Sequence, residues 1–313
     1  MKNEIEIVVF GTLNMDFVTY VDHLPGVGET IAASTFSLDP GGKAANQAVA
    51  ASRLGCRVAM VGRIGDDHLG SKLKEQLERN QVNHDHVRYT PESDTGMAVI
   101  SVDKDGQNTI VTFVGANAFL SKQDIDDVEP MLKQAKFAIM QMEMKQEVGE
   151  YLIQKAHQLG VELVLNLAPV VSIQPEVLQL VDLLIVNETE ASQMTGIEVN
   201  AANFSEHAAQ ALFDKGIKHV IVTLGAKGAV LKTADSMVHY ASPQVNAIDS
   251  TAAGDCFVAA TTSFWCKDGS LVTAVQKAVE AASLSVTRRG AQSSLPTLDE
   301  YIEFNQSLGL VQN

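Results

Sequence analysis

The sequence has 313 residues and a formal net charge of −15, which argues against nucleic acid or an anionic membrane surface as a partner. Hydrophobic residues make up 46% of the chain and aromatic residues only 5%, so a full core can form mainly from aliphatic side chains. This composition favours a mostly parallel sheet covered by helices. No apolar run reaches the length of a membrane span.

The three cysteines, Cys56, Cys256 and Cys266, form no Cys-x-x-Cys motif. Such a sparse, odd set indicates reduced thiols and a cytoplasmic protein. The chain begins with acidic and apolar residues in alternation, from Met1 to Ile7, which predicts the start of a strand and not a signal peptide.

Residues 5–10 are apolar and predict a buried first strand. Asn14 and Asp16 follow it, at the position where open α/β sheets bind ligands. An Asx-type turn would explain the same two residues equally well.

Two pairs of short alternating segments predict strands of a different kind. They cover residues 15–39 and 96–114, and the second pair is joined by a turn that contains Asp105-Gly106, a good hairpin signal. We interpret both pairs as one accessory sheet that serves as a lid over the site or as a dimer contact. Extra strands of the main sheet remain an equal alternative.

Gly41-Gly42-Lys43 opens an alanine-rich helix that Gly55 ends. Lys43 and Asn46 would present a cation and an amide from its first turn. The sequence is not a Walker A loop, because no Gly-Lys-Ser/Thr occurs at the required spacing. On local sequence alone, a tight turn before a packing helix is the favoured interpretation.

The middle of the chain alternates predicted strands and helices, with a helix expected over residues 120–136. Glu143 follows a strand, where it can bind a sugar hydroxyl or begin a helix. Asn187 and Glu190 follow another strand in the pattern of a capping box, which alone explains the pair. Their alternative role is to hold Mg²⁺ beside phosphates. Gly225-Ala226-Lys227-Gly228, after a strand at 219–224, is a weak motif for a nucleotide turn.

The most informative stretch is residues 248–257, a loop that turns into a helix. Ala252, Ala253 and Gly254 leave their backbone N–H groups bare, and unpaired donors at a helix N-terminus form an anion site. Asp255 would lie in the first turn, beside the bound anion, where it can take a proton from a hydroxyl group. An ordinary helix start with Thr251 as N-cap is the alternative.

Taken together, these motifs resemble the ribokinase-type (pfkB) carbohydrate kinases over about residues 8–296. The match rests on Gly41-Gly42-Lys43-x-Ala45-Asn46-Gln47-Ala48 and on Asp249-x-Thr251-Ala252-Ala253-Gly254-Asp255-x-Phe257, with Asn187-x-x-Glu190 and Thr223-Leu224-Gly225 between them. The resemblance implies a single domain over residues 1–313, an α/β three-layer sandwich with a central, mostly parallel sheet and a small β-sheet lid.

The resemblance also implies ATP-dependent phosphorylation of the 5-hydroxyl of D-ribose by a homodimer joined through the lid. A sibling activity on deoxyribose, a hexose or a nucleoside is the main alternative. A sugar-sensing protein that retains the fold without catalysis is a third, against which the intact Asp255 loop argues.

The implied roles fall into four groups. The sugar site would comprise Asn14, Asp16, Gly42, Lys43, Asn46 and Glu143, with Asp255 as base and the N–H groups of Ala252, Ala253, Gly254 and Asp255 as anion hole. ATP would contact Asn187, Thr223, Gly225, Ala226, Lys227, Gly228 and Gly254, and Mg²⁺ would be held near Asn187 and Glu190. A monovalent cation, K⁺, would be enclosed by Asp249, Thr251, Ser285, Arg288, Gly290 and Ser294. Ala44, Ser250 and Val279 depart from the residues usual in the family.

Overall fold

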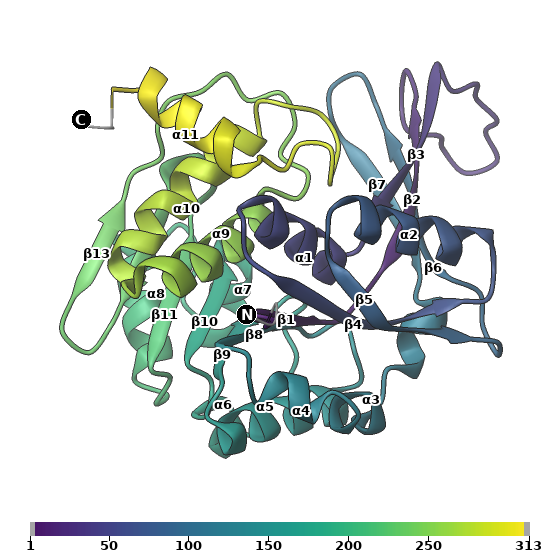
Figure 1. Ribbon diagram of the computed structural model, residues 1–313. Helices are drawn as coiled ribbons and strands as arrows, with labels where there is room; N and C mark the ends of the chain where they lie inside the picture. The colour runs from purple at the N-terminus through teal and green to yellow at the C-terminus, as the bar shows by residue number, and fades with distance from the viewer. Residues whose placement is uncertain (1–3, 310–313) are drawn as a thin grey trace.

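The computed structural model describes residues 4–309, which form two β-sheets and the helices around the larger one (Figure 1). The expected strand at the start of the chain lies partly outside these residues, at Met1 to Asn3, and the observed strand begins at Ile7. No helix within residues 4–309 combines the length and apolarity needed to cross a membrane.

The large sheet has nine strands, and all neighbouring pairs are parallel except at the β11–β12–β13 end. In spatial order the strands are β13 (Met237–Tyr240), β12 (Ala229–Lys232), β11 (His219–Thr223), β10 (Leu183–Asn187), β9 (Glu162–Asn166), β8 (Phe137–Gln141), β1 (Ile7–Phe10), β4 (Val58–Gly65) and β5 (Asn83–Thr90). The chain adds β4 and β5 on one side of β1, and β8 to β11 on the other. The strand order therefore reverses beside β1, and such a reversal opens a ligand crevice at the carboxyl ends of the strands.

Helices cover both faces of this sheet (Figure 1). On one face lie α1 (Lys43–Arg53), α2 (His68–Arg79), α9 (Ala253–Asp268), α10 (Leu271–Ser285) and α11 (Leu298–Ser307). On the other lie α3 (Lys122–Asp126), α4 (Glu129–Leu132), α5 (Gln146–Leu159), α6 (Pro175–Leu178), α7 (Glu188–Thr195) and α8 (Phe204–Phe213). Successive residues of β1 point alternately into the two hydrophobic clusters, which explains its unbroken apolar run.

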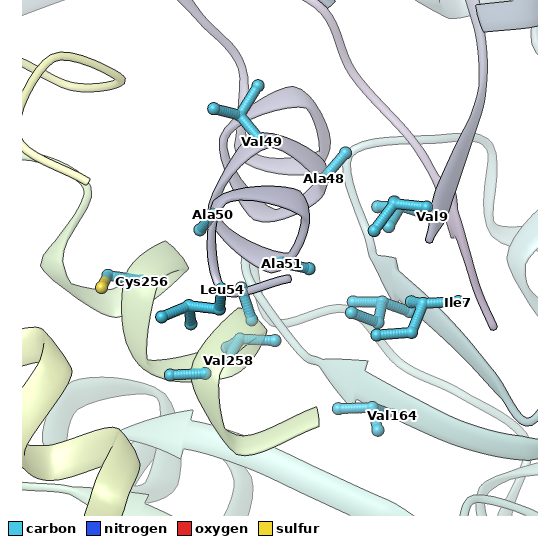
Figure 2. Close-up of a cluster of buried hydrophobic side chains, with 14 of the residues drawn as sticks. Ile7, Val9, Ala48, Val49, Ala50, Ala51, Leu54, Val164, Cys256 and Val258 are labelled. Atoms are coloured by element: carbon cyan, nitrogen blue, oxygen red, sulfur yellow. The ribbon is translucent and has the colours of Figure 1, made fainter. Parts of the chain in front are cut away.

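Helix α1 packs directly against α9 and the sheet. Figure 2 shows α1 between the Cys256–Val258 part of α9 and the β1 residues Ile7 and Val9. The buried residues of α1 are mostly alanines, and small side chains allow helices to approach closely. This packing brings the N-terminus of α1 next to the N-terminus of α9.

The small sheet contains four strands in the order β3 (Thr35–Gly41), β2 (Asn14–Tyr20), β6 (Gly96–Val102) and β7 (Asn108–Phe113). Figure 1 shows it projecting from the layered body. The two predicted pairs thus form one separate sheet and are not extra strands of the large one. Asn14 and Asp16 lie inside β2, paired with both β3 and β6, so the Asx turn considered for them does not form.

The helix expected over residues 120–136 is two short helices, α3 and α4. Ser121 is the N-cap of α3, and Asp124 Oδ2 accepts its backbone N–H at 2.9 Å and its hydroxyl at 2.8 Å. The helix ends because Pro130 starts α4 at its first turn, and proline cannot supply the backbone N–H that a continuous helix requires there.

Candidate functional site

Three adjoining cavities lie at the carboxyl edge of the large sheet. The small-sheet cavity, about 440 Å³, is lined by Thr12, Asn14, Thr112, Phe113, Val114, Asn117, Ala118, Glu143, Met144, Lys145 and Pro169. The central cavity, about 230 Å³, is lined by Lys43, Asn166, Ala168, Ile185, Val186, Asn187, Glu190, Thr223, Ala252, Gly254, Asp255 and Val258. The α10 cavity, about 300 Å³, is lined by Thr223, Gly225, Ala226, Gly228, Ser242, Pro243, Gln244, Val245, Ala247, Ser250, Ala253, Gly254, Phe257, Val279, Ala282, Ser283 and Val286.

The central cavity connects the other two. It shares Thr223 and Gly254 with the α10 cavity. On the opposite side, Lys43 Nζ lies 3.3 Å from Glu143 Oε1, and Glu143 lines the small-sheet cavity. Both outer cavities therefore lie next to residues that line the central one.

Asp255 lies in the first turn of α9 and faces the central cavity. Its Oδ2 accepts a hydrogen bond from Asn46 Nδ2 at 2.9 Å, and its Oδ1 accepts one from Gln47 Nε2 at 3.0 Å. Burial raises the pKa of Asp255 to about 6, and the two amide donors limit that rise. A carboxylate that titrates this close to neutrality is well placed to act as a general base.

The start of α9 differs from an ordinary capped helix. Ala252 is the N-cap, with φ 59°, and no side chain caps the helix, so the suggestion that Thr251 is the N-cap is wrong. Asp249 Oδ1 holds Thr251 instead, accepting hydrogen bonds from its N–H at 2.9 Å and from its hydroxyl at 2.7 Å.

The backbone at this helix start keeps free donors. The Ala253 N–H donates to Ser250 O at 3.2 Å, whereas within residues 4–309 the N–H groups of Gly254 and Asp255 have no acceptor. Because Gly254 has no side chain and is exposed, these donors are accessible from the cavity. Free N–H groups at a helix N-terminus can bind an anion.

Lys43 is the first residue of α1 and supplies a cation to the central cavity. Burial alone would lower its pKa, but Glu143 and Asp255 outweigh burial and hold the pKa above its ordinary value. Gly42, at φ 88°, allows the chain to enter the helix here, because a Cβ would meet Thr12 O at 2.7 Å and Asn14 N at 2.8 Å.

Two residues of β2 have different surroundings. Asn14 lines the small-sheet cavity and its Oδ1 accepts a hydrogen bond from Asn117 Nδ2 at 2.8 Å. Asp16 lies nearby, where burial first, and then the charges of Asp39 and Glu143, raise its pKa to about 7. Asp16, Gly42 and Asn46 are not among the residues that line this cavity.

Asn187 and Glu190 form the expected capping box and also line the central cavity. Glu190 Oε2 accepts the Asn187 N–H at 2.8 Å, and Asn187 Oδ1 accepts the Glu190 N–H at 2.8 Å. Burial raises the pKa of Glu190, although the Asn187 N–H and Lys43 oppose that rise. The structural role therefore does not exclude a role in the site.

Most, but not all, of the residues expected around ATP line the α10 cavity. Thr223, Gly225, Ala226, Gly228 and Gly254 line the α10 cavity, but Lys227 does not; its carbonyl accepts a hydrogen bond from His239. Val279 lines this cavity together with apolar residues of the segment 243–247, which sequence reasoning did not single out. That segment lacks a motif, so no signal in the sequence pointed to it.

The residues expected around K⁺ lie on two chain segments, 249–251 and 285–294. Asp249 Oδ2 accepts the Gly290 N–H at 2.9 Å, which joins the segments. Burial would raise the pKa of Asp249, but the Gly290 and Thr251 donors hold it below its ordinary value. The hydroxyls of Ser285 and Ser294 donate to carbonyls in their own turns, and Arg288 pairs with Glu300 at 2.9 Å.

The structure adds residues that sequence reasoning missed. Gln47 contacts Asp255, and Gln141 and Asn166 contact Gln47. Thr12 donates to Glu143 at 2.5 Å, and Asn117 binds Asn14. Gln141 and Asn166 are the last residues of β8 and β9, and this position was the available signal.

Comparison with known proteins identifies the family. A model of pfkB family carbohydrate kinases matches residues 4–298, so the chain belongs to that family and is a sugar phosphotransferase. A deoxyribokinase of Salmonella typhimurium is 36% identical over 300 residues, covering 96% of this chain and 98% of the relative. A ribokinase of Haemophilus influenzae is 38% identical over 298 residues, covering 95% and 97%.

Solved structures agree in fold. An Arabidopsis thaliana ribokinase complexed with ribose and ATP superposes with a TM-score of 0.88 at 31% identity, covering 96% of this chain and 98% of the other. A Thermotoga maritima ribokinase gives a TM-score of 0.86 at 34% identity, covering 96% and 99%. The large sheet, its helices and the small sheet are thus the ribokinase-like arrangement that the sequence predicted.

The raised pKa of Asp16 predicts how the stability of the ligand-free protein changes with pH. The folded protein holds this proton up to about pH 7, whereas the unfolded chain loses it near pH 3.8, the ordinary pKa of an aspartate. Ionisation of Asp16 therefore destabilises the fold progressively as the pH rises from about 4 to about 7. Asp16→Asn removes this effect, so its free energy of unfolding relative to wild type should increase over that window, as measured by denaturant unfolding.

Asp235→Asn, in the exposed turn between β12 and β13, is the matched control. Its free energy of unfolding should change with pH in the same way as that of wild type. A constant difference between Asp16→Asn and wild type from pH 4 to pH 8 would contradict the assignment.

Proposed function

We propose that this kinase transfers the γ-phosphoryl group of ATP to the 5-hydroxyl of D-ribose. The observation that carries the proposal is the tip of α9, where the Asp255 carboxylate and the free N–H groups of Gly254 and Asp255 face one cavity. That cavity lies between the small-sheet cavity, whose lining includes the polar side chains of Asn14, Asn117 and Glu143, and the α10 cavity. The single-domain arrangement proposed from the sequence is supported by two cores that share one sheet.

Asp255 would accept the hydroxyl proton as phosphoryl transfer proceeds. A carboxylate is far less basic than an alkoxide, so the proton must move late, which a loose transition state allows. The free N–H groups of α9 would hold the transferred phosphate oxygens, and loss of one such donor typically costs about 3 kcal/mol. Lys43 adds positive charge on the same side of the cavity.

The sugar would lie in the small-sheet cavity and extend to Asp255. Asn14, Asn117 and Glu143 line that cavity with hydrogen-bonding groups, and Lys43 reaches it through Glu143. Asp16 and Gly42, although outside its lining, lie close to Glu143 and Asn14 respectively. Asn46 binds Asp255, so its contact with a sugar would be made beside the base. The Arabidopsis ribokinase of similar fold is complexed with ribose and ATP, which supports a sugar and ATP as the two ligands.

ATP would lie in the α10 cavity with its phosphates in the central one. Apolar Val245, Val279 and Val286 suit a base ring, and Thr223 and Gly254 belong to both cavities. The oxygens of Asn187 and Glu190 suit Mg²⁺, which keeps several waters and takes few protein ligands. Within residues 4–309, no group of three or more His, Cys, Asp or Glu residues is placed to hold a metal ion, so the Mg²⁺ ion that we propose would be bound mainly through phosphates. When bound, Mg²⁺ would neutralise phosphate charge.

A monovalent cation, K⁺, would bind near Asp249. The residues fit in part: Asp249, Thr251 and Gly290 converge at the loop that leads into α9, whereas Arg288 is paired with Glu300. A cation at this point would order the loop that presents the anion-binding N–H groups.

The departures from the family's usual residues leave these groups in place. Ala44 is fully buried in the core of the α1 face. Ser250 and Val279 both line the α10 cavity, so they would affect contacts with the nucleotide and not the catalytic carboxylate of Asp255.

A homodimer through the small sheet is the quaternary structure we propose. Strand β7 is exposed along its whole length, and large apolar side chains are exposed on β3, β6 and β7: Phe36, Val99, Ile110, Val111 and Phe113. Exposed apolar groups gathered on one sheet indicate a protein contact. The same sheet borders the small-sheet cavity, so the contact would also cover the sugar site.

Deoxyribose is the strongest alternative substrate, because two Salmonella relatives at 36% identity are deoxyribokinases. A protein that binds sugar without catalysis is a further alternative, and the free α9 tip with its carboxylate argues against it.

A substrate panel tests the function directly. Ribose, 2-deoxyribose, fructose and adenosine are compared by coupled ADP release in K⁺ and then in Na⁺. We expect ribose to give the highest kcat/KM and replacement of K⁺ by Na⁺ to remove most of the activity. A higher kcat/KM for 2-deoxyribose would replace ribose as the substrate, and sugar binding without ADP formation would contradict a kinase.

Asp255→Asn tests the base. We expect kcat to fall at least about 1,000-fold, in line with loss of a general base together with its electrostatic role. Ribose affinity, measured by calorimetry, should stay within a few-fold. Asp268→Asn, at the other end of α9 where it pairs with Lys277, is the control and should retain activity. Turnover within about tenfold of wild type in Asp255→Asn would exclude the base role.

Val111→Asp tests the dimer. Val111 is 70% exposed on β7, and a charge buried in an apolar contact would be unpaired. Light scattering after gel filtration should show a dimer for wild type and a monomer for the variant. Val272→Asp, 47% exposed on α10, should leave the mass unchanged. A monomeric wild-type protein at micromolar concentration would contradict the proposal.

A further inference from the structure

Gln47, a residue to which no role has been assigned, binds the proposed base. It is fully buried on α1 and its Nε2 lies 3.0 Å from Asp255 Oδ1. The same Nε2 lies 3.2 Å from Asn166 Oδ1. Its Oε1 lies 2.5 Å from Nε2 of Gln141, which is also fully buried. The residues come from α1, α9 and the ends of β8 and β9.

The direction of these hydrogen bonds is fixed by the acceptors. A carboxylate only accepts, so Gln47 must present its NH₂ group to Asp255. Asn166 Nδ2 donates to Ile185 O, which leaves Asn166 Oδ1 facing Gln47 as a second acceptor. The Gln47 carbonyl oxygen must then face Gln141, which must donate. The donors therefore run one way, from Gln141 to Gln47 to Asp255.

The arrangement has a cost that packing alone does not explain. Gln141 Oε1 is buried and has no hydrogen-bond partner within the described residues. A Cβ added at Gly11 would lie only 2.5 Å from this oxygen. An apolar side chain at position 47 would avoid a row of buried amides and their desolvation. What the amides supply is a directed donor to the carboxylate.

We propose that Gln47 is a positioning residue for phosphoryl transfer: with Gln141 behind it, it forms a one-way amide relay that orients the Asp255 carboxylate and keeps it ionised. The inference rests on the function proposed above. Asn46 and Gln47 each occupy one site on a carboxylate oxygen, and the remaining lone pairs are left for the incoming hydroxyl at the central cavity. The relay also ties Asp255 to the sheet, so the base cannot rotate away from the α9 tip.

The test compares Gln47→Met, which keeps length but removes the donor, with wild type. The Asp255 pKa is read by ¹³C NMR of labelled aspartate carboxyl groups, with Asp255→Asn giving the assignment. Loss of a hydrogen bond to a charged group should raise the pKa of Asp255 by about one unit. The acidic limb of kcat against pH should shift upward equally, so kcat at pH 6 should fall about fivefold while the KM for ribose changes less than about threefold.

Two further variants make the result specific. Gln141→Met leaves Gln47 in place but removes the hydrogen bond that fixes the orientation of its amide. This variant should also raise the pKa of Asp255. Asn305→Leu removes another buried amide donor to a carboxylate, Glu280, far from the site on α11. It should lower thermal stability and leave both the pKa of Asp255 and the pH profile unchanged.

The possible failures are distinguishable. A wild-type protein that phosphorylates sugar, with an Asp255 pKa that neither Gln47→Met nor Gln141→Met changes, overturns the relay alone. A wild-type protein that phosphorylates no sugar overturns the proposed function, and with it the catalytic role of Gln47, even where the pKa shift is present.

Discussion

The site depends on the close packing of α1 against α9. Their N-termini meet because alanines of α1 allow the approach, and hydrogen bonds from Asn46 and Gln47 to Asp255 fix the two helix starts relative to each other. Both helices direct their positive ends to one cavity, and Lys43 adds a full charge. A shift of either helix would separate the cation, the carboxylate and the free N–H groups, so the core of this face determines the chemistry.

The electrostatic balance of the ligand-free site is the second constraint. Asp16, Glu143, Asp255 and Glu190 surround Lys43, and burial raises the pKa of Asp16, Asp255 and Glu190. One cation cannot neutralise four carboxylates in a partly buried space. Sugar hydroxyls that donate to Asp16 and Glu143, and a divalent cation near Glu190, would relieve this repulsion. Binding of these proposed ligands would therefore be favoured by the same repulsion that weakens the free protein.

The sequence predicted the architecture well where the apolar periodicity and the turn residues gave a clear pattern. Buried apolar runs such as Ile7–Phe10 specify parallel strands, and alternation with Asp105-Gly106 predicted the strands of the small sheet. Only the family resemblance implied that these strands form a separate sheet. The break at Pro130 was missed although its signal was present. Gln47 and Gln141 could not be assigned roles, because a polar residue inside an apolar pattern shows neither its partner nor its direction. Those depend on contacts between segments about 100 to 200 residues apart.

Two residues that the sequence left between a structural and a functional interpretation take part in the fold and also border the proposed site. Asn187 and Glu190 cap α7 with a complete pair of hydrogen bonds, and the same residues line the central cavity. Capping uses one carboxylate oxygen of Glu190, and a carboxylate has further lone pairs. The cap thus holds the side chain in a fixed orientation at the edge of the site. A ligand bound by these residues, as we propose, would meet a side chain that the fold already orders, so its binding would cost no extra ordering there.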